Sequence, residues 1–416
     1  MSARIQAPRG TYDVLPEAAD ARAALESTAR RVLEGAGYRR IETPAFEHSE
    51  LFSRGVGAST DIVQKEMFAF EDTRGSSFAL RPEGTAPICR AYHEHGMHKL
   101  PQPVKLWYLS SFFRKETPQA GRYRQFWQVG AEALGSDDPA VDAETILLLS
   151  VLLAELEVGG LRLRLGSLGT LEARTTYREE LQAHLRSNED RLSDEVRARI
   201  DLNPLRAFDA DDAGTRAVMA SAPLLLDRLD AADAEHFATV RELLDRAGVA
   251  YEVDPTLVRG MDYYTRTVFE FTSDKLGAQS GVAGGGRYDG LVEQLGGPPT
   301  PGCGWAAGIE RIQLAGPGLP VAPAPVELYV AYESAAQRTA AFAVAAEARD
   351  ARMNAQLELA GRSRKGQLKQ ADRLGARYVA LVNETGTVLK DMQSGEQKDV
   401  AAEQVVTRIL RERGMR

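Results

Sequence analysis

The stretch from Phe113 to Glu132, FRKETPQAGRYRQFWQVGAE, most constrains what this chain can fold into. Residues 104–113 and residues 124–134 are rich in β-branched and aromatic side chains, which predicts two strands. Pro, Gln, Ala and Gly at positions 118–121 predict the loop between them. Such a hairpin carries Arg114, Arg122 and Arg124 near its loop, where a guanidinium can bind phosphate or carboxylate oxygens through two parallel donors.

The spacing inside this hairpin favours one kind of chemistry. Arg114 and Glu116 are two residues apart, so on a strand they share a face and hold one ligand from the same side. An Arg can hold acid and α-phosphate oxygens while charge builds, and a carboxylate can accept the amine of adenine. Phe126 on the return strand can stack on a base. The alternative is that these charges form surface ion pairs without binding a ligand. When the hairpin is considered in isolation, this alternative is favoured.

Composition limits the classes of protein that remain. With 416 residues the chain is expected to form two or three domains, and its net charge of -8 argues against indiscriminate coating of nucleic acid. The longest apolar run, residues 146–154, is too short to cross a bilayer, and the N-terminus lacks the apolar core of a signal peptide. Cys89 and Cys303 form no CxxC pair. We therefore expect a cytoplasmic protein with no membrane partner, no disulfide framework and no structural zinc.

The first part of the chain mixes helices and strands. Apolar spacing predicts a helix over residues 17–35, and residues 37–47 predict a short strand that is broken by Pro44 and suits a subunit contact. Arg81 and Glu83 are expected at a strand end, with Pro87 in the first turn of the next helix. A helix is predicted over residues 137–156, capped by Asp137 or Asp138, and a strand over residues 161–168.

The rest of the chain divides into regions of different amino-acid composition. Residues from about 170 to 250 are charged and poor in Gly, which predicts a separate helical subdomain inserted into a domain of residues 1–320. Residues 316–325 are Pro-rich and predict a linker. Strands and helices then alternate over residues 326–416, which predicts a small α/β domain with a mostly parallel sheet. Within it Arg362, Arg364 and Lys365 start one helix, by default as solvated cations.

Three further motifs carry weak signals alone. The triple glycine at 284–286 lacks the GxxxxGK[ST] pattern, and a tight turn before a helix at 290–295 explains it equally well. Tyr263 and Tyr264 are adjacent, so on a strand only one of them would face a pocket. His93, His95 and His98 do not form HExxH, so we expect no metal site, and Cys89 is expected in the core.

Together these stretches resemble the histidyl-tRNA synthetases, a branch of the class II aminoacyl-tRNA synthetases. GYRRIETPAFE is similar to the first motif of that class, FRKETPQAGRYRQF to the second and GWAAGIERI to the third. LVRGMDYYTRTVFEF and GGGRYDGL resemble two signatures of the histidine enzymes, and RSRKGQLKQADRLGARYVALV resembles their anticodon-binding domain. The resemblance covers nearly the whole chain.

The resemblance implies an α+β fold. It consists of a class II synthetase antiparallel-sheet catalytic domain with a helical insertion, followed by a C-terminal α/β anticodon-binding domain at 326–416. It also implies a homodimer built partly through the first motif. The implied reaction joins L-histidine to tRNA(His) through a histidyl-adenylate and releases AMP and diphosphate. It uses ATP, with Mg²⁺ bound to the ATP.

The family's functional residues carry over onto matching positions. Arg114 would hold the histidine carboxylate and the α-phosphate, Arg259 would be a further catalytic cation beside that phosphate, and Arg311 would hold the γ-phosphate. Glu116 and Phe126 would bind adenine. The implied ATP set is Arg114, Glu116, Arg122, Phe126 and Arg311. The implied histidine set is Glu83, Thr85 and Gln128 for the α-amino group, Glu132, Tyr264 and Tyr288 for the imidazole, and also Arg114, Arg259 and Tyr263. The implied tRNA set is Gln119, Arg124, Arg362 and Arg364.

One position departs from the family pattern. Thr117 follows Glu116 where the family commonly has Arg, which leaves the contact of this loop with the tRNA acceptor end open. The closest rival is a catalytically inactive relative that serves as a regulatory subunit of ATP phosphoribosyltransferase. The retained Arg114, Glu116, Arg259 and Arg311 and the C-terminal domain argue against it. A synthetase for another amino acid of the subclass is a second rival, which RGMDYYT and the helical insertion disfavour.

Overall fold

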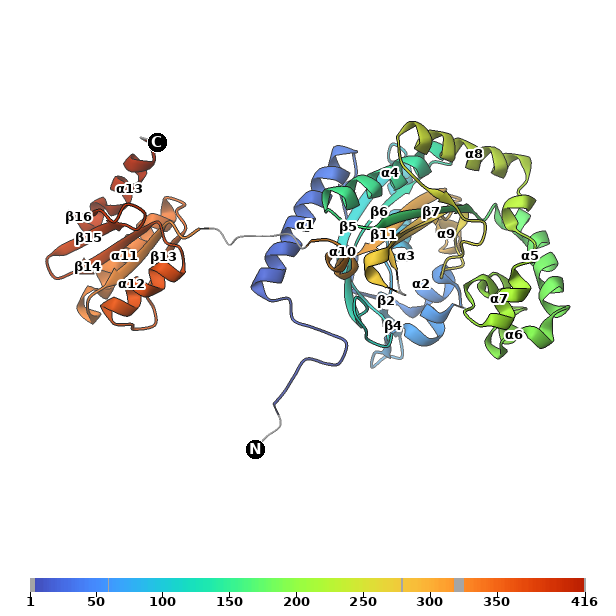
Figure 1. Ribbon diagram of the computed structural model, residues 1–416, viewed down its shortest axis with the longest axis horizontal. Coiled ribbons are helices and arrows are strands. Elements are labelled where there is room, and N and C mark those ends of the chain that lie inside the picture. The colour runs from blue at the N-terminus through green and yellow to red at the C-terminus, as the bar shows by residue number, and fades with distance from the viewer. Residues whose placement is uncertain (1–3, 59, 278–279, 318–324, 415–416) are drawn as a thin grey trace. The chain divides into compact units, whose positions relative to one another are not determined.

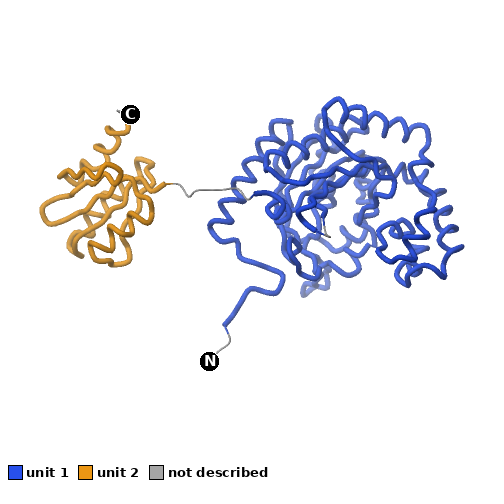
Figure 2. The backbone as a smooth tube through the Cα atoms, in the orientation of Figure 1, with its two compact units in different colours: residues 1–319 blue, residues 320–416 orange. Residues whose placement is uncertain are grey.

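The protein is described from a computed structural model that covers residues 4–58, 60–277, 280–317 and 325–414. The chain divides into two compact units, the first unit at residues 1–319 and the second unit at residues 320–416 (Figure 2). Most of the predicted Pro-rich linker, residues 318–324, lies outside the described residues. Within the described ranges, no helix combines the length and the apolar content that crossing a membrane requires.

A large sheet forms the centre of the first unit (Figure 1). Among the described residues it has eight strands in the order β1-β5-β6-β11-β10-β9-β7-β8, and only the edge pairs β1·β5 and β7·β8 are parallel. The strands are β1 Arg39–Arg40, β5 Val104–Phe113, β6 Gln125–Leu134, β7 Leu161–Ser167, β8 Glu252–Val253, β9 Thr265–Ser273, β10 Gly281–Arg287 and β11 Gly302–Gly308. The predicted antiparallel class is therefore confirmed, as are the strands at 104–113 and 124–134.

A second, smaller sheet and a set of helices complete the first unit. The sheet has the order β2-β4-β3, with β2 Phe46–His48, β3 Ala69–Glu71 and β4 Ser77–Leu80. The α-helices are α1 Pro16–Gly35, α2 Ser49–Phe52, α3 Thr85–Glu94, α4 Pro139–Glu155, α5 Leu171–Arg186, α6 Asp194–Arg199, α7 Ala213–Met219, α8 Ala231–Arg246, α9 Leu291–Gln294 and α10 Ile309–Ala315. Asp138 caps α4 by accepting from the amide of Ala140, as one of the two predicted caps.

Both faces of the large sheet are covered, and residue alternation decides which side chain meets which face. On β5, Trp107 and Leu109 join a core with helices α1, α4 and α8, whereas Tyr108 and Phe112 join a second core with α3 and α5. The same alternation on β6 sends Val129, Ala131 and Ala133 to the first core. Phe126, Gln128 and Glu132 are therefore left on the opposite face.

The predicted insertion is helical, but it is not one separate body. Figure 1 shows α5, α6 and α7 gathered at one side of the unit, whereas α8 lies beside α4. Phe237, Val240 and Leu244 of α8 are buried in the same core as α4 and the sheet. The prediction of a separate subdomain over 170–250 is therefore wrong for α8, because its apolar stripe is covered by the sheet domain itself.

The triple glycine is part of strand β10 and not the tight turn that the sequence equally suggested. A Cβ atom on Gly285 would lie 2.1 Å from the carbonyl oxygen of Gly304 and 2.7 Å from Cβ of Trp305. On Gly284 it would lie 2.2 Å from Nη2 of Arg259. The glycines thus let neighbouring groups approach the strand, a use of Gly that differs from turn formation.

The second unit is a mixed sheet with helices. In the part of the chain that the structure describes, its strands lie in the order β13-β12-β14-β15-β16, with β13·β12 and β12·β14 parallel and the other two pairs antiparallel. Its elements are β12 Leu328–Tyr332, α11 Arg338–Asp350, β13 Ala355–Leu357, α12 Arg364–Arg373, β14 Tyr378–Asn383, β15 Gly386–Asp391, β16 Gln397–Val400 and α13 Val405–Gly414. The predicted alternation is confirmed, but "mostly parallel" is wrong, since β15 returns as a hairpin and β16, which was not predicted, pairs with it.

The close approach at Gly285 gives a stability prediction. We expect Gly285→Ala to lower the free energy of unfolding by about 2–3 kcal/mol, because a methyl group there meets backbone that cannot move aside cheaply. Gly35 is at the end of α1, where a Cβ atom added to it would meet no atom from another described part of the chain within 4 Å. The free energy of unfolding of Gly35→Ala should therefore stay within about 1 kcal/mol of wild type. Urea unfolding of both variants measures the difference, and equal unfolding midpoints would contradict the assigned packing.

Candidate active site

The hairpin β5–β6 brings its charged residues together by a route that differs from the prediction. β5 ends at Phe113, so Arg114 and Glu116 lie in the following loop and not on a strand. They still meet, with Arg114 Nη1 3.7 Å and Arg122 Nη1 3.1 Å from the Glu116 carboxylate. A bridge between Gln119 and Arg122 closes the loop, and Gly121 adopts a φ of 73° that favours glycine.

This loop forms one wall of a cavity of about 420 Å³. The guanidinium of Arg114 lies 5.4 Å from the centre of the Phe126 ring, and its Nε donates to the carbonyl oxygen of Pro82 at 2.9 Å. Arg311, in the first turn of α10, also lines the cavity and lies beside Gly121 of the hairpin loop. The lining side chains from the predicted ATP set are Arg114, Glu116, Arg122, Phe126 and Arg311, so the structure brings all five together.

A second cavity of about 470 Å³ shares a boundary with the first. Its walls include the predicted histidine residues Glu83, Thr85, Arg114, Gln128, Arg259, Tyr263, Tyr264 and Tyr288. Arg114, Gln128 and Arg259 line both cavities. The shared boundary is therefore the place where groups bound in the two cavities would meet.

The two adjacent tyrosines both face the second cavity, contrary to the prediction. Tyr263 and Tyr264 precede β9, which begins at Thr265, so the alternation of a strand does not apply to them. Their ring centres are 4.7 Å apart, and both rings are almost fully buried. Two phenol groups are therefore available in the cavity where one was expected.

Glu132 lies directly behind the wall of the second cavity. Its carboxylate accepts hydrogen bonds from the Tyr288 hydroxyl at 2.5 Å and from the Thr85 hydroxyl at 2.8 Å, and both donors line the cavity. Burial raises the pKa of Glu132 from its ordinary value of 4.5 to about 8, although these two hydrogen bonds act in the opposite direction. No cation is among its hydrogen-bond partners in the described residues, so its charge depends on what enters the cavity.

Glu83 holds the start of helix α3. Its two carboxylate oxygens accept from the amides of Thr85 at 2.7 Å and Ala86 at 2.9 Å. Burial raises the pKa of Glu83 above its ordinary value, and the two amide donors oppose that rise. Each carboxylate oxygen can accept a further bond, so Glu83 can still receive a donor from the cavity.

Arg259 is half-buried at the boundary between the cavities. Its Nη1 lies 3.1 Å from Glu270 Oε1, and the bare backbone of Gly284 leaves space for the guanidinium. Glu270 also pairs with Arg164 at 3.3 Å. Because Gly284 has no side chain, a cation approaches the strand backbone and faces both cavities.

The sequence analysis missed some of the charged lining. Glu270 and Glu310 line the first cavity, and Arg206 and Asp209 line the second from the helical region. Glu310 was findable as the residue beside Arg311, whereas Arg206 and Asp209 are indistinguishable in sequence from the other charges of their region. Glu310 accepts from the Tyr12 hydroxyl at 2.5 Å and from the Trp127 amide at 3.0 Å, so it joins the N-terminal segment to β6.

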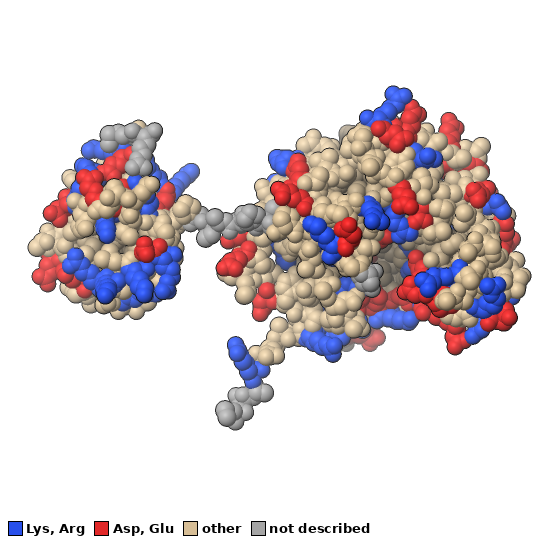
Figure 3. All heavy atoms as spheres, in the orientation of Figure 1, with Lys and Arg blue, Asp and Glu red and all other residues tan. Residues whose placement is uncertain are grey.

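The predicted tRNA residues lie in two places. Gln119 and Thr117 are exposed in the hairpin loop, whereas Arg124 lies against the N-terminal segment, where its amide donates to the Gly10 carbonyl at 2.7 Å. In the second unit, Arg364 is exposed at the start of α12, and Arg362 pairs with the buried Glu358 at 3.2 Å. Figure 3 shows Lys and Arg gathered on the side of this unit where α12 lies. Arg124 is thus less available than predicted.

The three histidines at 93, 95 and 98 and the two cysteines do not line these cavities. Within the described ranges, no group of three or more His, Cys, Asp or Glu side chains could hold a metal ion, so the cluster at His93, His95 and His98 does not form one. Cys89 and Cys303 are both buried and unpaired, which confirms Cys89 as a core residue.

Comparison with known proteins gives one consistent result. A sequence model of the histidyl-tRNA synthetase family matches residues 10–312. The histidine–tRNA ligase of Halorhodospira halophila is 50% identical over 382 residues, which cover 91% of this chain and 89% of that protein. The crystal structure of apo S. aureus histidyl-tRNA synthetase matches with a TM-score of 0.81 and 32% identity, over 98% of this chain and 100% of that chain.

A third match concerns the rival class. The structure of an ATP phosphoribosyltransferase regulatory subunit/histidyl-tRNA synthetase from Bacillus halodurans matches with a TM-score of 0.67 and 22% identity, over 93% of this chain and 100% of that chain. At this identity the match shows a shared fold and carries no further argument.

The raised pKa of Glu132 predicts a pH-dependent stability. Folding favours the protonated carboxyl of Glu132. Its contribution to the free energy of unfolding is therefore fully present below pH 4.5 and is lost as pH rises through about 8. Wild type should therefore lose unfolding free energy relative to Glu132→Gln between about pH 5 and pH 8, on the order of a few kcal/mol.

Urea unfolding at a series of pH values measures this difference. Glu172→Gln, which replaces an exposed carboxylate on α5, is the matched control and should follow the wild-type curve. Parallel curves for wild type and Glu132→Gln would contradict the assigned environment of Glu132.

Proposed function

The chain belongs to the histidyl-tRNA synthetase family, and from this premise we propose how its residues divide the work of the reaction. The protein is an enzyme that ligates L-histidine to tRNA(His). We assign two steps to it. A histidine carboxylate oxygen attacks the α-phosphorus of ATP and diphosphate leaves, and a hydroxyl of the terminal tRNA ribose then attacks the acyl carbon and AMP leaves.

The observation that carries the residue assignment is the shared boundary of the two cavities. Arg114 and Arg259 line both of them, so a carboxylate in one cavity and an α-phosphate in the other would meet beside two fixed cations. Arginine stays protonated, and preorganised cations stabilise charge that develops during phosphoryl transfer. We therefore assign catalysis to Arg114 and Arg259, with Arg311 of the first cavity holding the γ-phosphate.

The first cavity suits ATP, whose need is supported by the family. Phe126 offers a ring face to adenine, and Glu116 offers a carboxylate to its amine. Glu116 is paired with Arg114 and Arg122, and a bound triphosphate would take over those guanidinium groups. The ATP set is thus Arg114, Glu116, Arg122, Phe126 and Arg311.

Mg²⁺ is proposed to arrive bound to ATP. Magnesium is commonly held by one or two carboxylates together with substrate phosphates. Glu116 and Glu270 line the first cavity as such carboxylates, and the described residues contain no group of three or more His, Cys, Asp or Glu side chains that could hold a metal ion by itself. When bound, the ion would neutralise part of the triphosphate charge.

The second cavity suits histidine. Glu83, Thr85 and Gln128 are assigned to the α-amino group, and the Gln128 side-chain oxygen is buried without a partner in the described protein. Glu132, Tyr264 and Tyr288 are assigned to the imidazole, because a carboxylate and phenols can satisfy both ring nitrogens. Residues of similar size would leave these buried groups unpaired, which gives selectivity. Tyr263 completes the wall.

The tRNA is proposed to contact both units. The exposed loop with Gln119 faces the acceptor end, and Thr117 supplies a hydroxyl there in place of a cation. The basic surface over α12, with Arg362 and Arg364, suits the anticodon arm. Arg124 stays in the tRNA set, but a smaller contribution to tRNA binding is assigned to it because it lies against the N-terminal segment.

A homodimer is supported by an aromatic patch on the small sheet. Phe46 and Phe70 are 52% and 45% exposed, and each ring lies within about 6 Å of Phe78. Clustered exposed aromatics suit an interface, and a second copy offers the same patch. Phe46 lies within the first motif, where the subunit contact was predicted.

The regulatory-subunit alternative is not favoured. Curated relatives 43–50% identical are named histidine–tRNA ligases. Arg114, Glu116 and Arg311 line one cavity, as activation of histidine requires. A cytoplasmic location is proposed from the tRNA substrate and from the two buried thiols, which suit a reducing compartment.

Arg259 gives the test of the catalytic assignment. Wild type should exchange pyrophosphate into ATP with histidine and not with threonine or proline. Arg259→Ala should lower the histidine-dependent rate roughly 10²–10³-fold, because a cation beside the developing charge is lost. Arg164→Gln, which also frees Glu270 from one partner, should lower the rate far less. Near-wild-type exchange by Arg259→Ala would exclude its catalytic role.

Arg364 tests the assignment of the second unit. Arg364→Ala should raise the KM for tRNA in histidine charging and reduce its salt dependence by about one unit of log–log slope, since one phosphate contact is lost. Pyrophosphate exchange should not change. Arg408→Ala on α13 makes the same charge change elsewhere on the unit and should leave both assays unchanged. Equal effects of the two variants would refute the α12 surface.

A further inference from the structure

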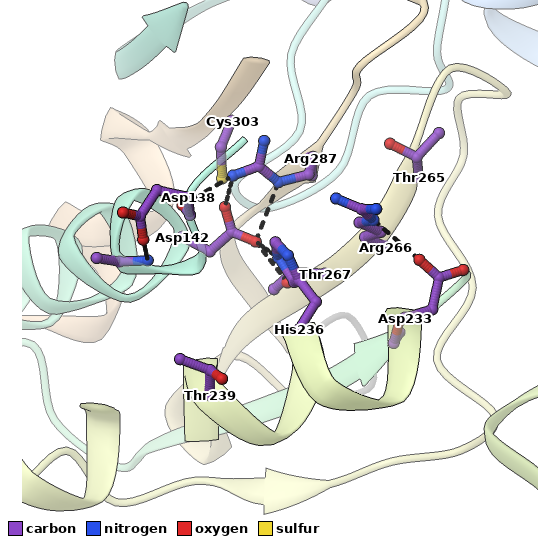
Figure 4. A network of polar contacts seen from close by, with 12 residues as sticks. Asp138, Asp142, Asp233, His236, Thr239, Thr265, Arg266, Thr267, Arg287 and Cys303 are labelled. Atoms are coloured by element: carbon purple, nitrogen blue, oxygen red, sulfur yellow. Dashed lines mark hydrogen bonds and ion pairs between the residues drawn. The ribbon is translucent and has the colours of Figure 1, made fainter. Parts of the chain in front are cut away.

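A buried ionic network lies beside the histidine cavity, and none of its members was assigned a role from the sequence (Figure 4). Asp142 of α4 and Arg287 of β10 are both fully buried and paired through two contacts, one of them from Arg287 Nε to Asp142 Oδ2 at 3.2 Å. His236 of α8 donates to the same oxygen at 2.8 Å, and Thr267 of β9 donates to it at 2.6 Å. Four elements thus meet at one carboxylate.

The Arg287 guanidinium is bound on every side. Besides Asp142, it donates to the carbonyl oxygens of Ser136 at 3.0 Å and Asp138 at 3.3 Å, and to Asp289 at 3.1 Å. A buried guanidinium with all its donors used is held in one position, because its planar fork permits few alternatives. Arg287 therefore ties the end of β10 to the turn that begins α4.

The residue between Arg287 and Asp289 is Tyr288. Asp289 is also fixed, since its Oδ1 accepts from the Gly302 amide at 3.3 Å and its own amide donates to the Thr265 hydroxyl at 3.2 Å. Both neighbours of Tyr288 are thus anchored to other elements. The Tyr288 ring lies against Gly302, and its hydroxyl bonds to Glu132.

The network also connects the helical region to the cavity. His236 lies on α8, within the predicted insertion, and Figure 4 shows its ring directed from α8 toward Asp142. Burial acts to raise the pKa of Asp142, but the hydrogen bond from His236 and the Arg287 charge outweigh burial and hold the pKa below its ordinary range. The carboxylate is thus a constant anchor for both partners.

We propose that Asp142, Arg287 and His236 are positioning residues for histidine recognition, which act through Tyr288 on Glu132. The inference rests on the proposed imidazole roles of Tyr288 and Glu132. Asp142 holds Arg287, Arg287 fixes the backbone that carries Tyr288, and His236 makes α8 a support of the same residue. A displaced Tyr288 hydroxyl weakens its bond to Glu132 and with it the fit to the imidazole.

The test is the KM for histidine compared with the KM for ATP in pyrophosphate exchange by the full-length enzyme. His236→Leu removes the donor to Asp142 and should raise the KM for histidine roughly tenfold while the KM for ATP changes less than about twofold. His236→Gln restores an N–H donor and should return the KM for histidine to within about threefold of wild type. Asp142→Asn and Arg287→Lys should act in the same direction as His236→Leu.

Arg266→Gln is the matched control. Arg266 pairs with Asp233 at 2.9 Å and so joins β9 to α8, as the network does, without contact to Asp142 or Arg287. It should lower the melting temperature without changing the KM for histidine. If His236→Leu lowers the melting temperature but leaves the KM for histidine unchanged, or changes both KM values alike, the network is only structural and the inference is overturned.

Two further variants separate this inference from the assignment on which it rests. If Glu132→Gln and Tyr288→Phe leave the KM for histidine unchanged, the imidazole assignment itself fails. If these two raise it and His236→Leu does not, the positioning inference alone fails. Should Asp142→Asn not fold, the His236 pair still decides the outcome.

Discussion

Two buried carboxylates on opposite faces of one sheet govern the structure of the first unit. An ionised carboxylate without partners is too costly to bury, so each must be neutralised or protonated. Asp142 meets a fixed guanidinium and two further donors, which keep it charged. Among the described residues, Glu132 accepts hydrogen bonds from the hydroxyls of Tyr288 and Thr85 alone, and burial, which these bonds compensate incompletely, raises its pKa to about 8. The first carboxylate is suited to anchoring, and the second is suited to a change of partner.

The part of the fold that follows local patterns was predictable from the sequence. Alternation and composition gave β5, β6 and α4, and capping residues gave the start of α4. The triple glycine was ambiguous because lack of a side chain suits a turn and a crowded strand equally. Trp305 and Arg259 approach β10 from other segments, which explains why glycines occupy a crowded strand here. Strand β16 was missed because its residues, QKDV, show no apolar alternation and are held by backbone pairing to β15.

The candidate site also has a part that could be predicted from the sequence and a part that could not. Candidate residues were identified inside recognisable motifs, and the structure brings the five predicted ATP residues into one cavity. The partners of those residues were not predictable. Asp142 is 94 residues from His236 and 145 from Arg287, and no spacing rule links such positions. Tyr263 and Tyr264 were misassigned for a local reason, since β9 begins at Thr265, two residues later than the alternation argument required.

Charge balance in the first cavity, the proposed ATP site, explains how several cations can lie close together. Glu116 lies between Arg114 and Arg122, and Glu270 of β9 pairs with Arg259. These carboxylates reduce repulsion among the guanidinium groups and hold them near their working positions. A triphosphate brings negative charge that can replace those contacts, so the guanidinium groups exchange one anionic partner for another and are not left unpaired. The cost of assembling the cations is thus met during folding, and less reorganisation remains when the substrate enters.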